Sequence, residues 1–177
     1  MIPISSWSYI SIGWWLTFIS NICCSFTVMK NIVVLENIRS CYNVWNILRT
    51  ADALGRDIIL TGYTPSPFSQ SKVKKTSLGA EDSIGITEFF TTSSALEFLK
   101  QKNYEIIAAE VTDSAIALSD YQQKKPPLVA VVLWNEVAWV ESETLAVVDR
   151  VVKIPMVWTK ESLNVWQTAA IFMWGLK

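Results

Sequence analysis

Histidine is absent from this chain of 177 residues, and glycine and cysteine are scarce. Without an imidazole, the chain has no base for a Ser or Cys catalytic triad and no His ligand for zinc. The three cysteines, Cys23, Cys24 and Cys41, lack the paired Cys-x-x-Cys spacing of a structural zinc site or a disulfide framework. We therefore expect a reducing, cytoplasmic environment and no bound metal.

Charged residues are also few, and their signs nearly balance. They make up 18% of the chain, against about 25% in an average globular protein. Hydrophobic residues reach 51%, which argues against intrinsic disorder. The net charge of −1 provides no overall basic field of the kind that marks many nucleic-acid-binding proteins. The length suits one domain with a short appendage.

The segment 1–28 differs from the rest because it contains no Asp, Glu, Lys or Arg. A secretory signal needs a positively charged start, and a transmembrane helix needs about 20 predominantly apolar residues, usually with flanking charges. The segment is marginal by both criteria. Three interpretations stay open: an upstream start codon chosen in place of Met29, a membrane anchor, or an additional structural element. We expect membrane attachment only if these residues are genuine.

The remainder, 29–177, alternates predicted strands and helices. Strands are predicted at 31–35, 57–61, 104–110, 128–133 and 151–154. Helices are predicted at 43–54, 94–102, 142–148 and 164–176. Asn43 is the expected N-cap and Gly55 the expected stop of the first helix, and a Ser94–Glu97 capping box is expected to open the second. This order predicts an α/β domain with a mostly parallel sheet and helices on both faces.

Four polar segments stand at places where such a domain could carry a site. They are 43–52 in the first helix, 72–81 in a long loop, 133–136 after a buried strand, and 154–165 before the last helix. Taken singly, each has a structural interpretation as a helix cap, a surface charge or a solvated loop. Ser162 or Asn164, for example, could simply cap the last helix. The segment 133–136 carries more weight, because ligands collect beyond the carboxyl ends of parallel strands.

Taken together, these segments resemble a known family. ENIRSCYNVWNILRTADALG, LTGYTP, KKTSLGAED, LWNEV and IPMVWTKESLNV are similar to the three motifs, and the loop between the first two, of the SpoU/TrmH RNA 2′-O-ribose methyltransferases of the SPOUT superfamily. The resemblance covers essentially 29–177. It implies S-adenosylmethionine as cofactor, a tRNA or rRNA substrate, and a homodimer with the active site at its interface. It also implies a C-terminal segment threaded into a trefoil knot, which is rare among folds.

The resemblance also assigns roles to individual residues. Catalytic roles fall on Asn43, Arg49, Glu136, Ser162 and Asn164. Cofactor-binding roles fall on Leu133, Trp134, Asn135, Ile154, Met156, Trp158 and Leu163. Independently of the resemblance, the charges of Lys72, Lys74 and Lys75 suit phosphates, so we expect these residues to bind RNA. Because an Arg side chain stays protonated in proteins, we expect Arg49 to hold a phosphate and stabilise the developing alkoxide instead of acting as a base.

The chain contains unusually many tryptophans and unusually few glycines, with 9 Trp and 6 Gly. Trp45, Trp134, Trp139 and Trp158 stand where the family motifs carry glycine, and Trp166 where small residues are usual. Glycine suits such positions where the backbone needs a positive φ or approaches a ligand closely. We hypothesise that these positions are encoded by UGA, which the source organism reads as glycine. UGG codons at positions 45, 134, 139 and 158 would contradict this hypothesis. If the tryptophans are genuine, the alternative is a degenerate, non-catalytic RNA-binding or dimerisation module.

Overall fold

The computed structural model describes residues 30–69, 83–123, 128–134, 142–157 and 162–176, so the segment 1–28 lies outside it. The strands are β1 (Ile32–Glu36), β2 (Asp57–Thr61), β3 (Ile86–Phe89), β4 (Glu105–Ala109), β5 (Ile116–Ala117), β6 (Val129–Trp134) and β7 (Arg150–Lys153). The helices are α2 (Cys41–Leu54), α4 (Thr92–Gln101), α5 (Ser142–Val147) and α6 (Val165–Gly175).

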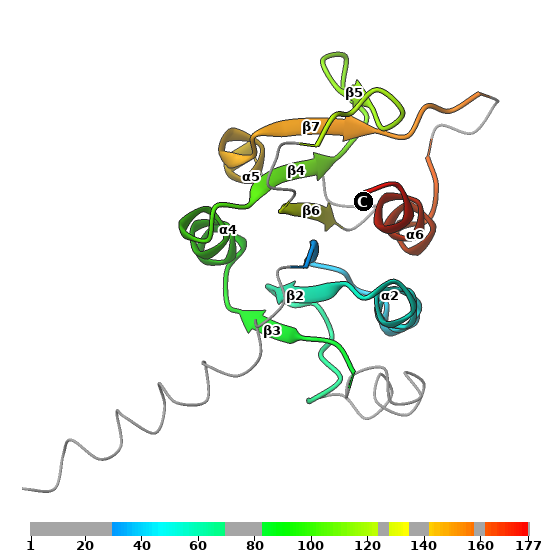
Figure 1. The fold of residues 1–177 in the computed structure, drawn as a ribbon. Coiled ribbons are helices and arrows are strands. Elements are labelled where there is room, and N and C mark those ends of the chain that lie inside the picture. Colours follow the sequence, from blue (N-terminus) through cyan, green and yellow to red (C-terminus); the bar gives the residue numbers. More distant parts are fainter. Residues whose placement is uncertain (1–29, 70–82, 124–127, 135–141, 158–161, 177) are drawn as a thin grey trace, which may run out of the picture.

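One seven-stranded sheet, in the order β3-β2-β1-β6-β4-β7-β5, runs through the centre of the domain. All six strand pairings are parallel. Figure 1 shows α2 and α6 on one face of the sheet and α4 and α5 on the other. The predicted α/β architecture, with a mostly parallel sheet covered on both faces, is therefore confirmed.

The alternating side chains of β1 explain why both faces must be covered. Val33 and Leu35 face α2 and α6, whereas Ile32 and Val34 face α4, and all five residues of the strand are buried. A strand buried on both sides is typical of parallel sheets. Each fully buried Val, Leu or Ile stabilises the fold by roughly 1.5–3 kcal/mol relative to leaving it exposed.

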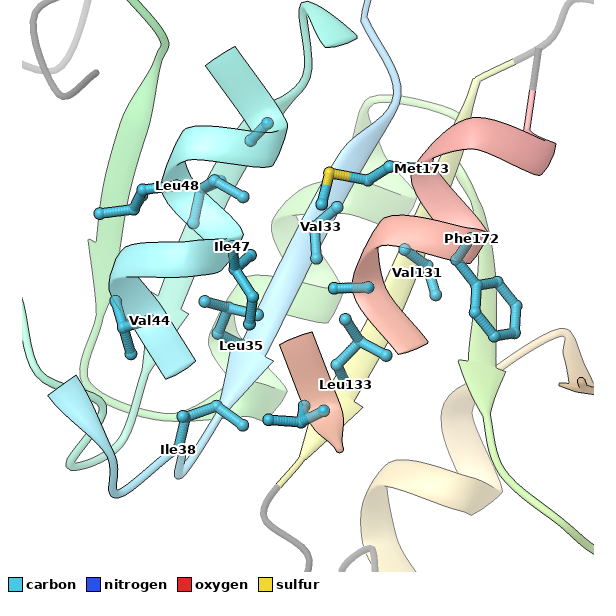
Figure 2. Close-up of a cluster of buried hydrophobic side chains, with 14 of the residues drawn as sticks. Val33, Leu35, Ile38, Val44, Ile47, Leu48, Val131, Leu133, Phe172 and Met173 are labelled. Atoms are coloured by element: carbon cyan, nitrogen blue, oxygen red, sulfur yellow. The ribbon is translucent and has the colours of Figure 1, made fainter. Parts of the chain in front are cut away.

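The helices α2 and α6 pack against each other, although α2 lies early in the described chain and α6 lies at its end. Ile47 and Leu48 of α2 and Phe172 and Met173 of α6 are buried in one cluster over the sheet. Figure 2 shows Ile47 beside Leu35 and Met173 beside Val33, both on the central strand β1. The C-terminal helix is therefore fixed directly beside the end of β6.

Two helix starts differ from prediction. Ser40, not Asn43, is the N-cap of α2, because its Oγ accepts a hydrogen bond of 3.3 Å from the backbone N of Asn43. Likewise, Thr91 caps α4 by accepting from Ser94 N at 3.2 Å, so the predicted capping box at Ser94 is wrong. Gly55 ends α2 with a φ of 62°, as predicted.

Two strands were not predicted from the sequence, and both lie at the outer edges of the sheet. β3 has 4 partly exposed residues and β5 has only 2, so neither produces the continuous apolar run of a central strand. Within the described ranges, no helix is long and apolar enough to cross a membrane.

Candidate functional site

A cavity of about 260 Å³ lies at the carboxyl edge of the sheet, where β4, β6 and β7 end and α6 begins. Three neighbouring parallel strands end here, and their last side chains form its floor. Val152 and Phe172, both buried, line the cavity and join it to the apolar core. The site is therefore an extension of the core that opens beyond the ends of the strands, the place where open parallel sheets bind ligands.

The structure brings six of the sequence-predicted site residues together around this cavity. They are Leu133 and Trp134 at the end of β6, Ile154 and Met156 after β7, and Ser162 and Leu163 before α6. These residues are separated by up to 30 positions in the sequence, and the parallel register brings the ends of their strands side by side. Their shared location agrees with a common pocket, while their individual roles stay predictions.

The sequence analysis missed the part of the cavity wall that follows β4. Glu110 and Val111 line it there, and Lys153 does so at the end of β7. The carboxylate of Glu110 accepts a hydrogen bond of 2.7 Å from Val111 N, and the ammonium of Lys153 donates to the Thr112 carbonyl at 3.3 Å. The signal that could have found them is their position directly after two strands of a parallel sheet.

Arg49 does not line the cavity of its own chain. Its side chain is exposed on α2, where the guanidinium carbon lies 5.4 Å from the centroid of the Trp45 ring. The Trp45 ring in turn lies 5.5 Å from that of Tyr42, so the three side chains form a row along the outer surface of α2. Asn43 is half-buried near the start of the same helix and is absent from the cavity wall.

Asn164 has a clear structural role as the N-cap of α6. Its side-chain oxygen accepts from Trp166 N at 3.2 Å, and the Gln167 side chain accepts from Asn164 N at 3.3 Å, which completes a capping box. Of the two capping residues that the sequence allowed, Asn164 is therefore the right one, and Ser162 lies exposed at the cavity. A catalytic role for Asn164 stays a prediction.

Seven further residues of the sequence analysis lie outside the described residues. They are Lys72, Lys74, Lys75, Asn135, Glu136, Trp139 and Trp158. No group of three or more His, Cys, Asp or Glu side chains that could hold a metal occurs in the part of the chain that the structure covers.

The described tryptophans do not occupy backbone conformations that favour glycine. Trp45 lies within α2, Trp134 ends β6 and Trp166 lies in the first turn of α6. Among the described non-glycine residues, a positive φ occurs only at Asn37 and Asn103. A need for positive φ is therefore the wrong explanation for glycine at positions 45 and 134. Close approach to a ligand remains an explanation for Trp134, because this residue lines the cavity.

A fully parallel sheet with a largely apolar cavity beyond its strand ends defines the class: an α/β protein with a pocket for a small organic ligand. The family follows from comparison with known proteins. The chain belongs to the SpoU rRNA Methylase family, whose model matches residues 30–174.

Individual relatives agree with this assignment. Over 143 residues the chain is 30% identical to the tRNA (guanosine(18)-2′-O)-methyltransferase of Thermus thermophilus, a match that covers 80% of this chain and 71% of that protein. The enzyme of the same name from Escherichia coli K12 is 25% identical, with 80% and 60% covered. The AdoMet-bound rRNA methyltransferase from Sinorhizobium meliloti superposes with a TM-score of 0.75 at 25% identity, covering 83% of this chain and 55% of that one.

Proposed function

We propose that this protein transfers a methyl group from S-adenosylmethionine to the ribose 2′-hydroxyl of a tRNA or rRNA. The observation that carries the proposal is the cavity at the ends of β4, β6 and β7, which gathers residues of two family motifs in a chain that belongs to the SpoU family. Its relatives are named methyltransferases, which favours this function over a non-catalytic module.

The residues of the cavity fit an adenosyl cofactor. Leu133, Ile154 and Leu163 offer apolar surface for a purine ring, while the Glu110 carboxylate offers an acceptor for hydroxyl or ammonium groups. When bound, S-adenosylmethionine supplies an activated methyl group. The cavity volume of about 260 Å³ is slightly below the ~300–1,000 Å³ of typical ligand pockets. Trp134 is the largest side chain at the cavity wall, so a smaller residue at this position would enlarge the cavity.

The protein's own contribution to the reaction would be alignment and electrostatics. Holding the 2′-hydroxyl in line with the methyl donor can supply ~7–11 kcal/mol of the barrier reduction. We propose that the Arg49 guanidinium binds a substrate phosphate and stabilises negative charge on the attacking oxygen. Because Arg49 lies outside the cavity of its own chain, we propose a homodimer in which it serves the cavity of the second copy.

Apolar side chains exposed on two adjoining helices support the homodimer. Trp174 and Ile171 on α6 are 75% and 40% exposed, and Tyr42 on α2 is 61% exposed. Large exposed apolar groups on a protein surface favour an interface. We further propose that the C-terminal segment forms the trefoil knot of the family, with α6 held between α2 and the end of β6.

Calorimetric titration with S-adenosylmethionine tests the proposal most directly. Two versions of the full chain are compared, one as written and one with glycine at positions 45, 134, 139 and 158. We expect the glycine version to bind the cofactor and to methylate tRNA or rRNA, and the tryptophan version to bind at least about tenfold more weakly, a loss of about 1.4 kcal/mol. Cofactor binding by neither version would contradict the proposal and leave the non-catalytic module.

The substrate RNA is identified by a second experiment. Sites of 2′-O-methylation are mapped in the tRNA and rRNA of the source organism before and after deletion of the gene. We expect a single class of ribose to lose its methyl group. An unchanged methylation map, together with an inactive glycine version, would rule out the methyltransferase.

A further inference from the structure

Three aromatic side chains project into solvent from the loops that follow β2 and β3. Tyr63, Phe68 and Phe90 are 57%, 65% and 95% exposed. Exposure of a large ring costs hydrophobic stabilisation, and Phe90 gains almost none from its own chain. These three rings lie at the carboxyl edge of the sheet, which is also the edge of the cavity, but over strands on the other side of β1.

Side-chain hydrogen bonds connect the two loops to each other and to the sheet. The hydroxyls of Thr61 and Thr92 lie 2.8 Å apart, which joins the end of β2, next to Tyr63, to the start of α4, next to Phe90. Ser66, between the other two rings, donates to the Glu88 carboxylate of β3. These contacts tie the segments that carry the three rings to the carboxyl ends of two neighbouring strands, β2 and β3.

The segment between Tyr63 and Phe68 is packed against the domain and hydrogen-bonded. Residues 64–67, which include two prolines, are buried between the exposed Tyr63 and Phe68. Phe68 N donates to Ser66 Oγ at 3.1 Å. Gly62, with a φ of 63°, makes the turn after β2 and passes too close to the Asn37 side chain to accept a Cβ. Rings held on an ordered loop lose little conformational freedom when they bind a partner.

The adjoining loop carries an exposed cation. Arg39 is exposed in the loop after β1, and its neighbour Ile38 donates from its backbone N to Thr64 Oγ1 at 3.0 Å. The carboxylate of Glu88 in β3 accepts the Ser66 hydrogen bond. Exposed rings next to a guanidinium are the features with which proteins hold single-stranded nucleic acid: rings stack on bases and cations contact phosphates.

We propose that Tyr63, Phe68 and Phe90, with Arg39 beside them, form an aromatic strip that stacks unpaired bases of the RNA substrate. This inference rests on the proposed function, since it specifies how that substrate is recognised. From β3 to β6 there are three strand spacings, or about 14 Å at ~4.8 Å each. At the ~3.4 Å rise of a stacked strand this corresponds to about four nucleotides. The strip therefore contacts bases a few positions from the methylated ribose and favours single-stranded over duplex RNA.

Ring-specific variants of the full chain test the strip. Phe68→Leu with Phe90→Leu keeps apolar side chains but removes the rings, and Phe68→Trp with Phe90→Trp keeps rings. The probes are an unstructured RNA of about 20 nucleotides and a duplex of the same length, measured by fluorescence anisotropy. For the single strand, we expect the Leu pair to raise Kd about tenfold or more and the Trp pair to bind at least as tightly as the wild type. Duplex affinity should change less than twofold.

Two controls separate stacking from general loss of structure. Val147→Ala, which shortens an exposed apolar side chain of α5 outside the strip, should leave RNA affinity unchanged. Arg39→Gln should lower the salt dependence of binding by about one phosphate contact, whereas Arg39→Lys should retain it. If the Leu pair binds the single strand within twofold of wild type, or weakens the duplex equally, the strip does not stack bases.

Cofactor titration on the same samples separates this inference from the proposed function. All strip variants should bind S-adenosylmethionine like the parent protein, because no strip residue lines the cavity. Ring-dependent RNA binding by a protein that never binds the cofactor would uphold the strip and overturn the methyltransferase. Cofactor binding and methyl transfer by a protein whose RNA binding does not depend on the rings would uphold the methyltransferase and overturn the strip.

Discussion

Arg56, at the start of β2, closes the C-terminal end of α6. Its guanidinium donates to the carbonyls of Met173, at 3.1 Å, and of Leu176. The last carbonyls of a helix have no partner within the helix, so an outside donor satisfies them. The contact is partly buried, and this burial lowers the pKa of Arg56. One side chain thus fixes the end of the chain to an element more than 100 residues earlier.

We expect Arg56→Met to lower the free energy of unfolding by about 2 kcal/mol, because charge-assisted hydrogen bonds to two carbonyls are lost. Arg56→Lys should recover part of the loss. Urea denaturation followed by circular dichroism measures both. Lys100→Met, at an exposed position of α4, is the matched control and should change stability by less than about 0.5 kcal/mol. Equal effects of Arg56→Met and the control would show that Arg56 does not secure α6.

A second residue-scale contact sets the behaviour of the protein at high pH. Tyr121 donates to Glu105 Oε2 at 3.0 Å, and Arg150 Nε lies 3.1 Å from Glu105 Oε1. Burial raises the pKa of Tyr121, and the hydrogen bond and charge of Glu105 raise it further. Because the pKa is higher in the folded than in the unfolded chain, the folded state keeps its proton to higher pH. The resulting stabilisation is complete below the unfolded-state pKa of about 10 and is lost as the pH rises beyond it.

Tyr121→Phe should therefore be less stable than the wild type at pH 7, by about 1 kcal/mol for the lost hydrogen bond. Its stability should then fall less steeply between pH ~9.5 and ~11. Urea denaturation at four pH values measures both slopes. Parallel pH profiles for the two proteins would show that Tyr121 does not contribute to the alkaline loss.

At the scale of elements, the start of α6 contains both a helix cap and residues of the predicted cofactor site. Asn164 caps the helix, and the residues just before it, Ser162 and Leu163, line the cavity. The cap thus lies within the segment that forms the cavity wall, because Val165, Thr168 and Phe172 of α6 also line the cavity. A change at Asn164 therefore affects both stability and the site, and the two effects need separate measurements.

We expect Asn164→Ala to lower stability by about 1 kcal/mol, the usual cost of losing an N-cap. Asn164→Asp keeps the acceptor oxygen and should remain within about 0.5 kcal/mol of wild type. Thermal unfolding gives the stability, and single-turnover methyl transfer gives the rate. An Asp variant that is stable but transfers methyl groups more than about tenfold more slowly would indicate a direct role of the amide in the reaction.

At the scale of the whole molecule, Arg49 lies outside the cavity of its own chain, although its proposed role requires it to reach a substrate bound at a cavity. Arg49 packs on Trp45 along the outer surface of α2, whereas the cavity lies beyond the ends of β4, β6 and β7. In a twofold dimer, each subunit presents the same surface to the other. An arginine of one subunit can therefore complete the cavity of its partner.

Mixing two inactive variants tests this arrangement. Arg49→Gln removes the arginine, and Leu163→Trp fills the cavity. If Arg49 serves the second subunit, mixed dimers contain one complete site, and a refolded equimolar mixture should regain about a quarter of wild-type activity. If Arg49 serves its own subunit, the mixture stays inactive. Each variant alone provides the baseline, and size-exclusion chromatography checks that dimers form.

Particular elements show which parts of the structure could be predicted. The central strands β1, β2, β4 and β6 are continuous apolar runs buried on both faces, so their pattern stands out in the sequence. β3 and β5 are short edge strands and give no such signal. The caps were displaced by three residues because Ser40 and Asn43, and likewise Thr91 and Ser94, are both good capping residues. Only the backbone geometry distinguishes them.

By itself, the sequence determined the α/β architecture, the family resemblance and six of the residues around the cavity, because burial patterns and motifs are local properties of the chain. The tertiary structure alone decided that Glu110 and Lys153 join that set, that Arg49 stands apart from it, and that Arg56 holds the last helix. Proximity of this kind depends on strand order and register, which bring together residues far apart in the chain, and no local pattern encodes it.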